Sequence, residues 1–145
     1  MGLPAARFAR QADLDWCLFT ATSQADDTFL RLIDEQRLVV AERQQQLTGM
    51  LQFNYLWPGY DFTLPLIEVV LVPEPHRRQG AGTAMLSFAE NHLRTQGCKT
   101  LLISATVNEP EPQAWHRRMG FKECGFWSGA EFADGVGELF FAKSL

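Results

Sequence analysis

A glycine-containing segment carries the clearest chemical pattern in the sequence. It lies between an apolar run and an amphipathic run and reads Pro73-Glu74-Pro75-His76-Arg77-Arg78-Gln79-Gly80-Ala81-Gly82-Thr83. Glycines let the backbone approach a ligand closely, and a helix N-terminus presents N–H groups and partial positive charge. Arg77 and Arg78 add two full positive charges. The segment therefore favours phosphate binding, and a tight turn with solvated arginines is the alternative.

Two common phosphate-binding motifs do not fit this loop. A Walker loop ends in Gly-Lys followed by Ser or Thr, whereas Gly82 is followed by Thr83 and Ala84. A dinucleotide-binding fingerprint requires a third glycine at the position where Met85 stands. The loop therefore belongs to neither of these nucleotide-binding classes.

Hydrophobic periodicity predicts the elements that position the loop. Residues 66–72 are apolar and β-branched, as in a buried strand, and a helix over 81–96 follows, with Gly97 just past its end. A strand over 100–107 completes a strand–helix–strand unit, whose two strands we expect to be parallel. Asp13 can cap a first helix. Further strands are expected at 5–10, 38–41, 47–55, 122–127 and 137–142, and further helices at 13–23, 26–36 and 112–119.

Composition limits the class of protein. A chain of 145 residues with 46% hydrophobic and 21% charged residues predicts a single globular domain over 1–145. No apolar run is long enough to span a membrane, and the cysteines, Cys17, Cys98 and Cys124, have no metal-type spacing. We therefore expect a cytoplasmic protein without a metal site or disulfide.

The net charge of −4 is unevenly distributed along the chain. Residues 1–75 carry a net −5, residues 76–122 a net +4 and residues 123–145 a net −3. An acidic total argues against a general nucleic-acid-binding protein. The basic segment contains the glycine loop, which fits a phosphate-bearing ligand.

The segment Arg77-Arg78-Gln79-Gly80-Ala81-Gly82 resembles the Gln/Arg-x-x-Gly-x-Gly/Ala signature of the GNAT superfamily, the acyl-CoA-dependent N-acyltransferases. Residues 38–42 and 47–49 resemble the first hairpin of that family, and residues 115–125 resemble its C-terminal helix and Gly-Phe turn. The resemblance covers roughly residues 37–142. It implies an α/β (α+β) fold, a mixed twisted sheet of six to seven strands with about four helices, in which strands 66–72 and 100–107 splay apart for the cofactor.

The resemblance also implies acetyl-CoA as co-substrate. Backbone amides from Arg78 to Thr83 would hold the pyrophosphate, and the main chain at Val70 and Val72 would pair with the pantetheine as an added strand. Asn108 resembles a family asparagine that contacts the cofactor. The cofactor-binding residues expected from this resemblance are Val70, Val72, Arg77, Arg78, Gln79, Gly80, Ala81, Gly82, Thr83 and Asn108.

The family chemistry is attack of a neutral amine on a thioester, which needs a base, N–H donors for the oxyanion and optionally an acid. Glu68, the only acidic residue of its strand, is the candidate base, and we expect it to be half-buried; an edge glutamate paired to a cation is the alternative. His116 stands where the family usually has a tyrosine that protonates the departing thiolate. A surface histidine on an amphipathic helix is the alternative there. His76 is expected to pack in the loop or contact the cofactor, and His92 to be solvated.

The acceptor site of the family is built by the first two helices, a hairpin turn and the last strands. Here these segments are rich in aromatic and acidic residues: Trp16, Phe19, Phe29, Tyr55, Trp57, Tyr60, Phe62, Phe126 and Trp127, with Asp26, Asp27, Asp61, Glu131 and Asp134. This composition favours a small, cationic primary amine as substrate. A peptide or aminoacyl-tRNA amine, or a non-catalytic acyl-CoA-binding module, are the alternatives, and a homodimer is left open.

Overall fold

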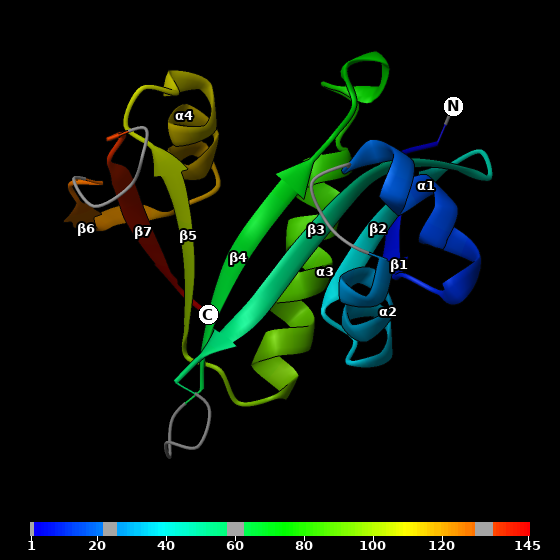
Figure 1. Ribbon diagram of the computed structural model, residues 1–145, viewed down its shortest axis with the longest axis horizontal. Coiled ribbons are helices and arrows are strands. Elements are labelled where there is room, and N and C mark those ends of the chain that lie inside the picture. The colour runs from blue at the N-terminus through cyan, green and yellow to red at the C-terminus, as the bar shows by residue number, and fades with distance from the viewer. Residues whose placement is uncertain (1, 22–25, 58–62, 130–134) are drawn as a thin grey trace. The chain divides into compact units, whose positions relative to one another are not determined.

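The computed structural model describes residues 2–21, 26–57, 63–129 and 135–145 (Figure 1). In chain order its elements are β1 (Ala5–Phe8), the 3₁₀ helix η1 (Gln11–Asp13), α1 (Leu14–Thr20), α2 (Asp26–Asp34), β2 (Leu38–Arg43), β3 (Gln46–Leu56), β4 (Leu64–Leu71), the 3₁₀ helix η2 (Glu74–His76), α3 (Ala81–Thr95), β5 (Thr100–Thr106), α4 (Pro110–Arg118), β6 (Lys122–Trp127) and β7 (Glu138–Ser144). The chain divides into two compact units, a first unit of residues 1–54 and 69–92 and a second unit of residues 55–68 and 93–145.

Seven strands of the described residues form one sheet in the order β1-β2-β3-β4-β5-β7-β6. β4 and β5 are parallel, and the pairs β1–β2, β2–β3, β5–β7 and β6–β7 are antiparallel. The mixed sheet, its parallel central pair and four α-helices among the described residues confirm the expected fold class. The β4–β5 ladder consists of Leu66–Leu102 and Ile67–Ile103 alone. The splaying of these strands and the single-domain organisation stay predictions.

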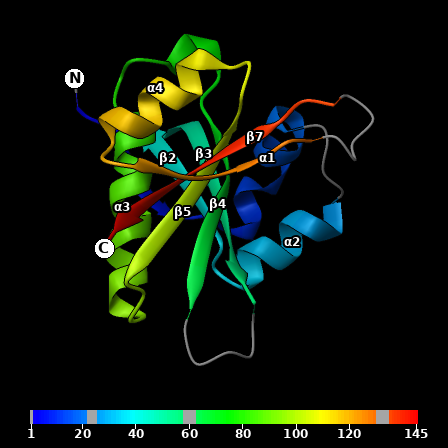
Figure 2. The ribbon, with the colours of Figure 1, turned by 90° about the vertical axis from the view of Figure 1, so that its left-hand side faces the viewer.

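In the first unit, helices cover both faces of β1–β3 (Figure 2). Leu38 and Val40 point to one face and pack with Phe29 of α2 in a buried cluster that also includes Cys17 of α1. On the other face, the ring of Phe8 meets Phe88 of α3 edge to face, with 4.9 Å between centroids. This two-sided burial follows from the apolar runs of β2 and β3, which alternate between the faces.

His92 contacts the α3 side of this core and is half-buried rather than solvated as expected. Its ring lies 4.8 Å from Phe8 and 6.3 Å from Phe53, between ring centroids. Burial lowers the pKa of His92. Sequence periodicity could not reveal this, because the contact depends on how β1 lies against α3.

The turn of the β2–β3 hairpin has an unusual composition. Arg43 pairs with Gln46, and the two residues between them, Gln44 and Gln45, both have positive φ, 51° and 65°. A two-residue hairpin turn of this kind requires φ > 0 at both positions and usually uses Asn or Gly. The predicted hairpin is therefore present, with a turn that glutamines rather than glycines form.

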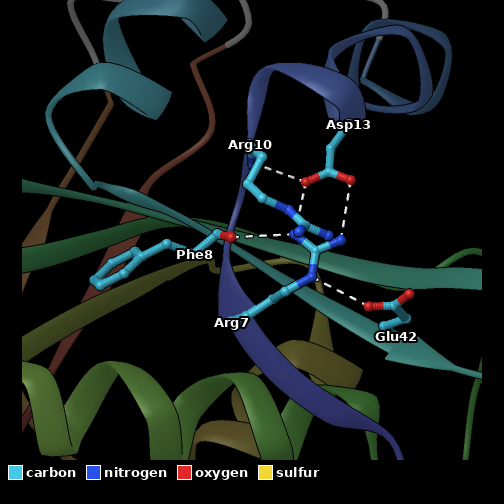
Figure 3. A network of polar contacts seen from close by, with 5 residues as sticks. All are labelled: Arg7, Phe8, Arg10, Asp13 and Glu42. Carbon is cyan, nitrogen blue, oxygen red and sulfur yellow. Dashed lines mark hydrogen bonds and ion pairs between the residues drawn. The ribbon is translucent and has the colours of Figure 1, made fainter. Parts of the chain in front are cut away.

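A network of polar contacts around Arg7 joins β1, η1 and β2 (Figure 3). The Arg7 guanidinium donates to both oxygens of Asp13, at 2.7 and 3.1 Å, and to Glu42 at 3.1 Å. The backbone N–H of Arg10 also donates to Asp13, at 2.7 Å. Burial alone would raise the pKa of Asp13, but these bonds outweigh it and the pKa is lowered.

Asp13 was expected to cap the first helix, and it occupies the N-cap position of α1 without making the expected side-chain bond. Its side chain makes no capping bond to α1 and instead closes η1 through Arg10. The helix expected at 13–23 is η1 followed by α1, which ends at Thr20, and residues 22–25 lie outside the described residues.

In the second unit, α4 packs on one face of β5 and β7, and β6 pairs with β7. α4 begins at Pro110, two residues before the expected start, because a proline is tolerated in the first turn of a helix. It ends at Arg118, one residue before the expected end at Met119, and Gly120 follows the C-cap with a φ of +94°, as expected for the residue that stops the helix. The N–H groups of Gly120 and Phe121 donate to the carbonyls of Arg117 and His116, at 3.1 and 3.0 Å. This Schellman arrangement satisfies the last carbonyls of the helix.

Candidate active site

The glycine loop lies in the first unit, between the end of β4 and α3. Arg78 and Gly80 have left-handed φ values of 62° and 91°. The N–H of Ala84 donates to the carbonyl of Gly80 at 3.0 Å, which makes Ala81 and Gly82 the first residues of the helix. Their amides have no carbonyl acceptor in a preceding turn of the helix. The loop thus presents helix N-terminal amides beside two exposed arginines, an arrangement suited to a phosphate.

Two side chains brace the loop. Arg77 donates from Nε to the carbonyl oxygen of Val72 at 2.8 Å, which closes the segment from 72 to 77. Arg43, at the end of β2, donates to Oε1 of Gln79 at 2.6 Å. Gln79 is half-buried, unlike the exposed Arg77 and Arg78. Sequence analysis missed Arg43, because the contact joins residues 36 positions apart.

The expected main-chain partners of pantetheine lie at the C-terminal end of β4. Val70 is within the strand, and Val72 lies one residue beyond its end at Leu71. Both side chains are half-buried. The Val72 carbonyl already accepts the hydrogen bond from Arg77, so any contact that it makes with a ligand uses its second lone pair.

The second unit contains Glu68 and Asn108. Glu68 follows Ile67, the last β4 residue paired with β5, and its side chain is exposed rather than half-buried as expected. Asn108 is exposed in the turn after β5, which is closed by a hydrogen bond from the Glu109 N–H to the Thr106 carbonyl at 3.1 Å. An exposed carboxylate can exchange protons with solvent directly, which a general base requires in order to turn over.

His116 is buried, with 5% of its surface exposed, so it is not a surface histidine. Its Nε2 lies 3.0 Å from the Ser104 carbonyl oxygen. A carbonyl only accepts, so Nε2 carries the proton in this contact. Nδ1 is buried and has no hydrogen-bond partner among the described residues. Burial lowers the pKa of His116, which favours the neutral ring with its lone pair on Nδ1.

A polar cluster on the opposite face of the β5–β7 ladder escaped the sequence analysis. Ser104 hydrogen-bonds the carboxylate of Glu138, and Glu109 acts on the same carboxylate through its charge. Burial of Glu138 is the largest effect and raises its pKa, with Glu109 acting in the same direction. Thr106, the strand partner of Glu138, has a buried hydroxyl without a hydrogen-bond partner among the described residues. Only the β5–β7 register brings these residues together, and no local sequence pattern encodes it.

The cysteines carry no reactive pattern. All three are free thiols; Cys17 and Cys98 are buried and Cys124 is exposed. Burial is the main cause that raises the pKa of Cys17 to about 12, which makes it a poor nucleophile. In the described ranges, no group of three or more His, Cys, Asp or Glu side chains could hold a metal ion. Among the helices that the structure describes, none is long and apolar enough to cross a membrane.

The sheet order, the parallel central pair and the braced loop before α3 define an α/β architecture with a helix N-terminus suited to a phosphate. A family comparison agrees with this class: the model of the Acetyltransferase (GNAT) family matches residues 8–121. The chain belongs to this family, and it is an acetyltransferase by that membership. The resemblance to this family seen in the sequence is thereby confirmed. A search of curated protein sequences found no match.

Solved structures of low sequence identity share the fold. A ribosomal-protein-alanine N-acetyltransferase from Brucella melitensis is 22% identical, with a TM-score of 0.81 over 97% of this chain and 99% of that one. YncA, a putative acetyltransferase from Salmonella typhimurium solved with its cofactor acetyl-CoA, is 18% identical, with a TM-score of 0.82 over 99% and 95%. Arabidopsis thaliana Naa50, in complex with the bisubstrate analogue CoA-Ac-MVNAL, is 13% identical, with a TM-score of 0.81 over 99% and 100%.

Proposed function

We propose that this chain transfers an acetyl group from acetyl-CoA to a primary amine by direct attack in a ternary complex. The observation that carries the proposal is the loop from Arg78 to Thr83, where left-handed residues lead into a helix N-terminus beside two arginines. The cofactor of the Salmonella structure, which shares this fold, supports acetyl-CoA as the ligand. The amides of this loop, together with Val70, Val72, Arg77 and Asn108, are the proposed coenzyme contacts.

Glu68 is the proposed general base. The amine must lose a proton before or during attack, and an exposed carboxylate on β4 can accept it and pass it to water. The nitrogen–carbon bond then forms, the carbon–sulfur bond breaks, and the coenzyme leaves as a thiolate that takes up one proton. Glu68 follows the last β4 residue that pairs with β5, so it lies where the β4–β5 ladder ends.

His116 fits a positioning role better than that of the acid. The proton on Nε2 is held by the Ser104 carbonyl, and the lowered pKa disfavours a second proton on Nδ1. We therefore propose that His116 fastens α4 to β5 and that the thiolate takes its proton from solvent. The sequence-based assignment of His116 as the acid remains the alternative, and the variants described in the Discussion decide between them.

For the acceptor, we propose a small, cationic primary amine. The acidic segments and the exposed aromatic side chains Phe19, Trp57 and Phe126 support this choice. Tyr60, Asp61, Phe62, Glu131 and Asp134 of the expected acceptor segments lie outside the described residues, as does the side chain of Asp26. The second candidate is the N-terminal amine of a peptide, favoured by the Brucella enzyme and by the peptide portion of the Naa50 analogue.

A thiol-release assay with acetyl-CoA and an amine panel tests the proposal. The panel contains spermidine, an aminoglycoside, lysine, and pentapeptides beginning with alanine or methionine, with N-acetylated versions of the peptides as controls. Release with the small amines alone supports the proposed acceptor. Release with free-amine peptides alone replaces it with the second candidate. Binding of acetyl-CoA without release for any amine indicates a non-catalytic module and overturns the proposed reaction.

A further inference from the structure

Arg43 connects three segments of the first unit that are distant in sequence. It is the last residue of β2 and is half-buried. Its Nε donates to the carbonyl of Gly2 at 3.1 Å, and one terminal nitrogen donates to Oε1 of Gln79 at 2.6 Å. A charged donor at this distance makes a strong hydrogen bond. Arg43 therefore ties the hairpin and the N-terminal segment to the coenzyme loop.

The β2–β3 hairpin, which carries Arg43, also lies close to the residue that precedes the loop, Val72. The β2–β3 register shifts between Ala41, which pairs with Gly49, and Glu42, which pairs with Leu47, so Thr48 is an extra residue on β3. A Cβ on Gly49 would lie 3.2 Å from Cγ2 of Val72. The glycine thus permits a close approach of β3 to the end of β4.

The N-terminal segment also lies next to the loop. A Cβ on Gly80 would lie 3.7 Å from Cδ of Pro4, which is buried. The carbonyl of Gly2, two residues earlier, accepts the second bond of Arg43. Both neighbours of Gln79, Arg78 and Gly80, have left-handed φ values, and Arg78 does so with a full side chain. Such a conformation is disfavoured for an isolated L-residue and persists where the surroundings hold it.

We propose that Arg43 is a positioning residue for coenzyme A. Through the side chain of Gln79 it holds the backbone of residues 78–80 in the conformation that aims the loop amides at the pyrophosphate. The inference rests on the proposed function, because it takes the loop to be the coenzyme site. It assigns no ligand contact to Arg43 itself, so its loss weakens coenzyme binding and leaves the chemical step intact.

The test compares the full-length protein with Arg43→Met, Gln79→Met and the double variant. Methionine removes the donor or the acceptor and keeps a flexible side chain of similar length, and Gln79→Met keeps the Arg43 charge and the loop amide. Calorimetry gives the Kd of coenzyme A, and steady-state kinetics give KM for acetyl-CoA and kcat. We expect each single variant to raise Kd and KM about 10-fold, with kcat changed less than about twofold.

The double variant separates the brace from a simple loss of charge. If Arg43 acts through Gln79, the double variant binds coenzyme A no more weakly than the weaker single variant. If Arg43 acts only as a positive charge near phosphate, Gln79→Met binds normally and the Arg43→Met effect fades at 0.5 M salt. Normal coenzyme binding by Gln79→Met overturns the proposal, and so does an Arg43→Met effect that fades at high salt. A Kd of coenzyme A that both single variants leave unchanged overturns it as well.

Controls keep the outcome interpretable. Arg37→Met removes another arginine of the first unit, which bonds Glu35 and the Phe53 carbonyl, and it should leave the Kd of coenzyme A unchanged. Arg43→Lys keeps one donor and should recover part of the affinity. Should Arg43→Met not fold, Gln79→Met alone still decides, since an unchanged Kd there contradicts the brace. A wild-type chain that does not bind coenzyme A overturns the proposed function, whereas normal wild-type binding with unaffected variants overturns the brace alone.

Discussion

Replacing His116 with phenylalanine separates the two roles open to this histidine. Phenylalanine keeps an aromatic ring where the imidazole meets Phe141 at 5.3 Å and Phe121 at 6.2 Å between ring centroids. It removes the N–H that donates to the Ser104 carbonyl at 3.0 Å. A buried carbonyl that loses its donor costs about 1–3 kcal/mol of folding free energy. A chain of this size loses roughly 2–4 °C in Tm for each kcal/mol, so we expect a fall of a few to about ten degrees.

His116→Gln is the matched control for this loss. Glutamine lacks an acidic proton, but its amide N–H can reach the position of Nε2 and donate to the same carbonyl. We expect this variant to recover part of the stability lost in His116→Phe, measured by urea unfolding followed by circular dichroism. We expect both variants to retain kcat within a few-fold at temperatures where they are folded.

The acid assignment predicts the opposite pattern. If His116 protonates the thiolate, both variants lose on the order of 10²-fold in kcat, and His116→Gln does so while it stays folded. That result refutes the positioning role. A pH series adds a second readout: since burial lowers the pKa of His116, the folded chain binds this proton less readily than the unfolded chain. The contribution of His116 to the free energy of unfolding is then complete above its unfolded pKa, near 6.5. It is lost as the pH falls through the lowered pKa of the folded chain. His116→Gln should abolish this pH dependence.

Three further predictions concern carboxylates. Glu68→Gln should lower kcat and remove the acidic limb of the pH–rate profile; a profile that keeps this limb excludes Glu68 as the base. Glu138→Gln should stabilise the chain at pH 7. Burial raises the pKa of Glu138 in the folded chain, so the free energy of unfolding falls as the pH rises from the pKa of the unfolded chain toward that of the folded chain. Thermal unfolding at pH 5 and pH 7 measures this, and equal effects at both pH values contradict it. Asp13→Asn should cost about 1–3 kcal/mol at pH 7, because it removes the charged partner of Arg7. The lowered pKa of Asp13 means that this contribution disappears as the pH falls below the unfolded value of about 3.8, so the variant and the wild type should converge in acid urea titrations.

The sequence predicted those features whose signals are local. The apolar β-branched run before the loop gave β4, the amphipathic stripe ending at Gly97 gave α3, and Gly120 marked the end of α4. Each depends on residues within a few positions of one another. These local signals do not specify the order of the outer strands in the sheet, which the structure supplies.

The features that the sequence did not predict all depend on contacts between distant segments. Aspartate is a common N-cap residue, but the carboxylate of Asp13 accepts hydrogen bonds from Arg7 on β1 instead. His92 and His116 occupy positions on amphipathic helices that could be solvated, and the packing of α3 and α4 leaves the first half-buried and the second buried. The exposure of Glu68 likewise depends on what covers its face of β4, which the apolar run of the strand does not reveal.

The basic segment 76–122 shows the same limit at the level of charge. Its net +4 fits a phosphate-bearing ligand, yet the structure divides its cations between the two units. Arg77 and Arg78 belong to the loop, and the Nε of Arg77 donates a hydrogen bond to the Val72 carbonyl. Arg117, by contrast, pairs with Glu123 and lies 5.5 Å from the centre of the Phe141 ring, where it supports the packing of α4 on β7. A charge run along a sequence is therefore not yet a binding surface. In the proposed coenzyme site the loop arginines lie beside the helix N-terminus, so the strength of coenzyme binding should follow the geometry of that loop more closely than the net charge of the segment.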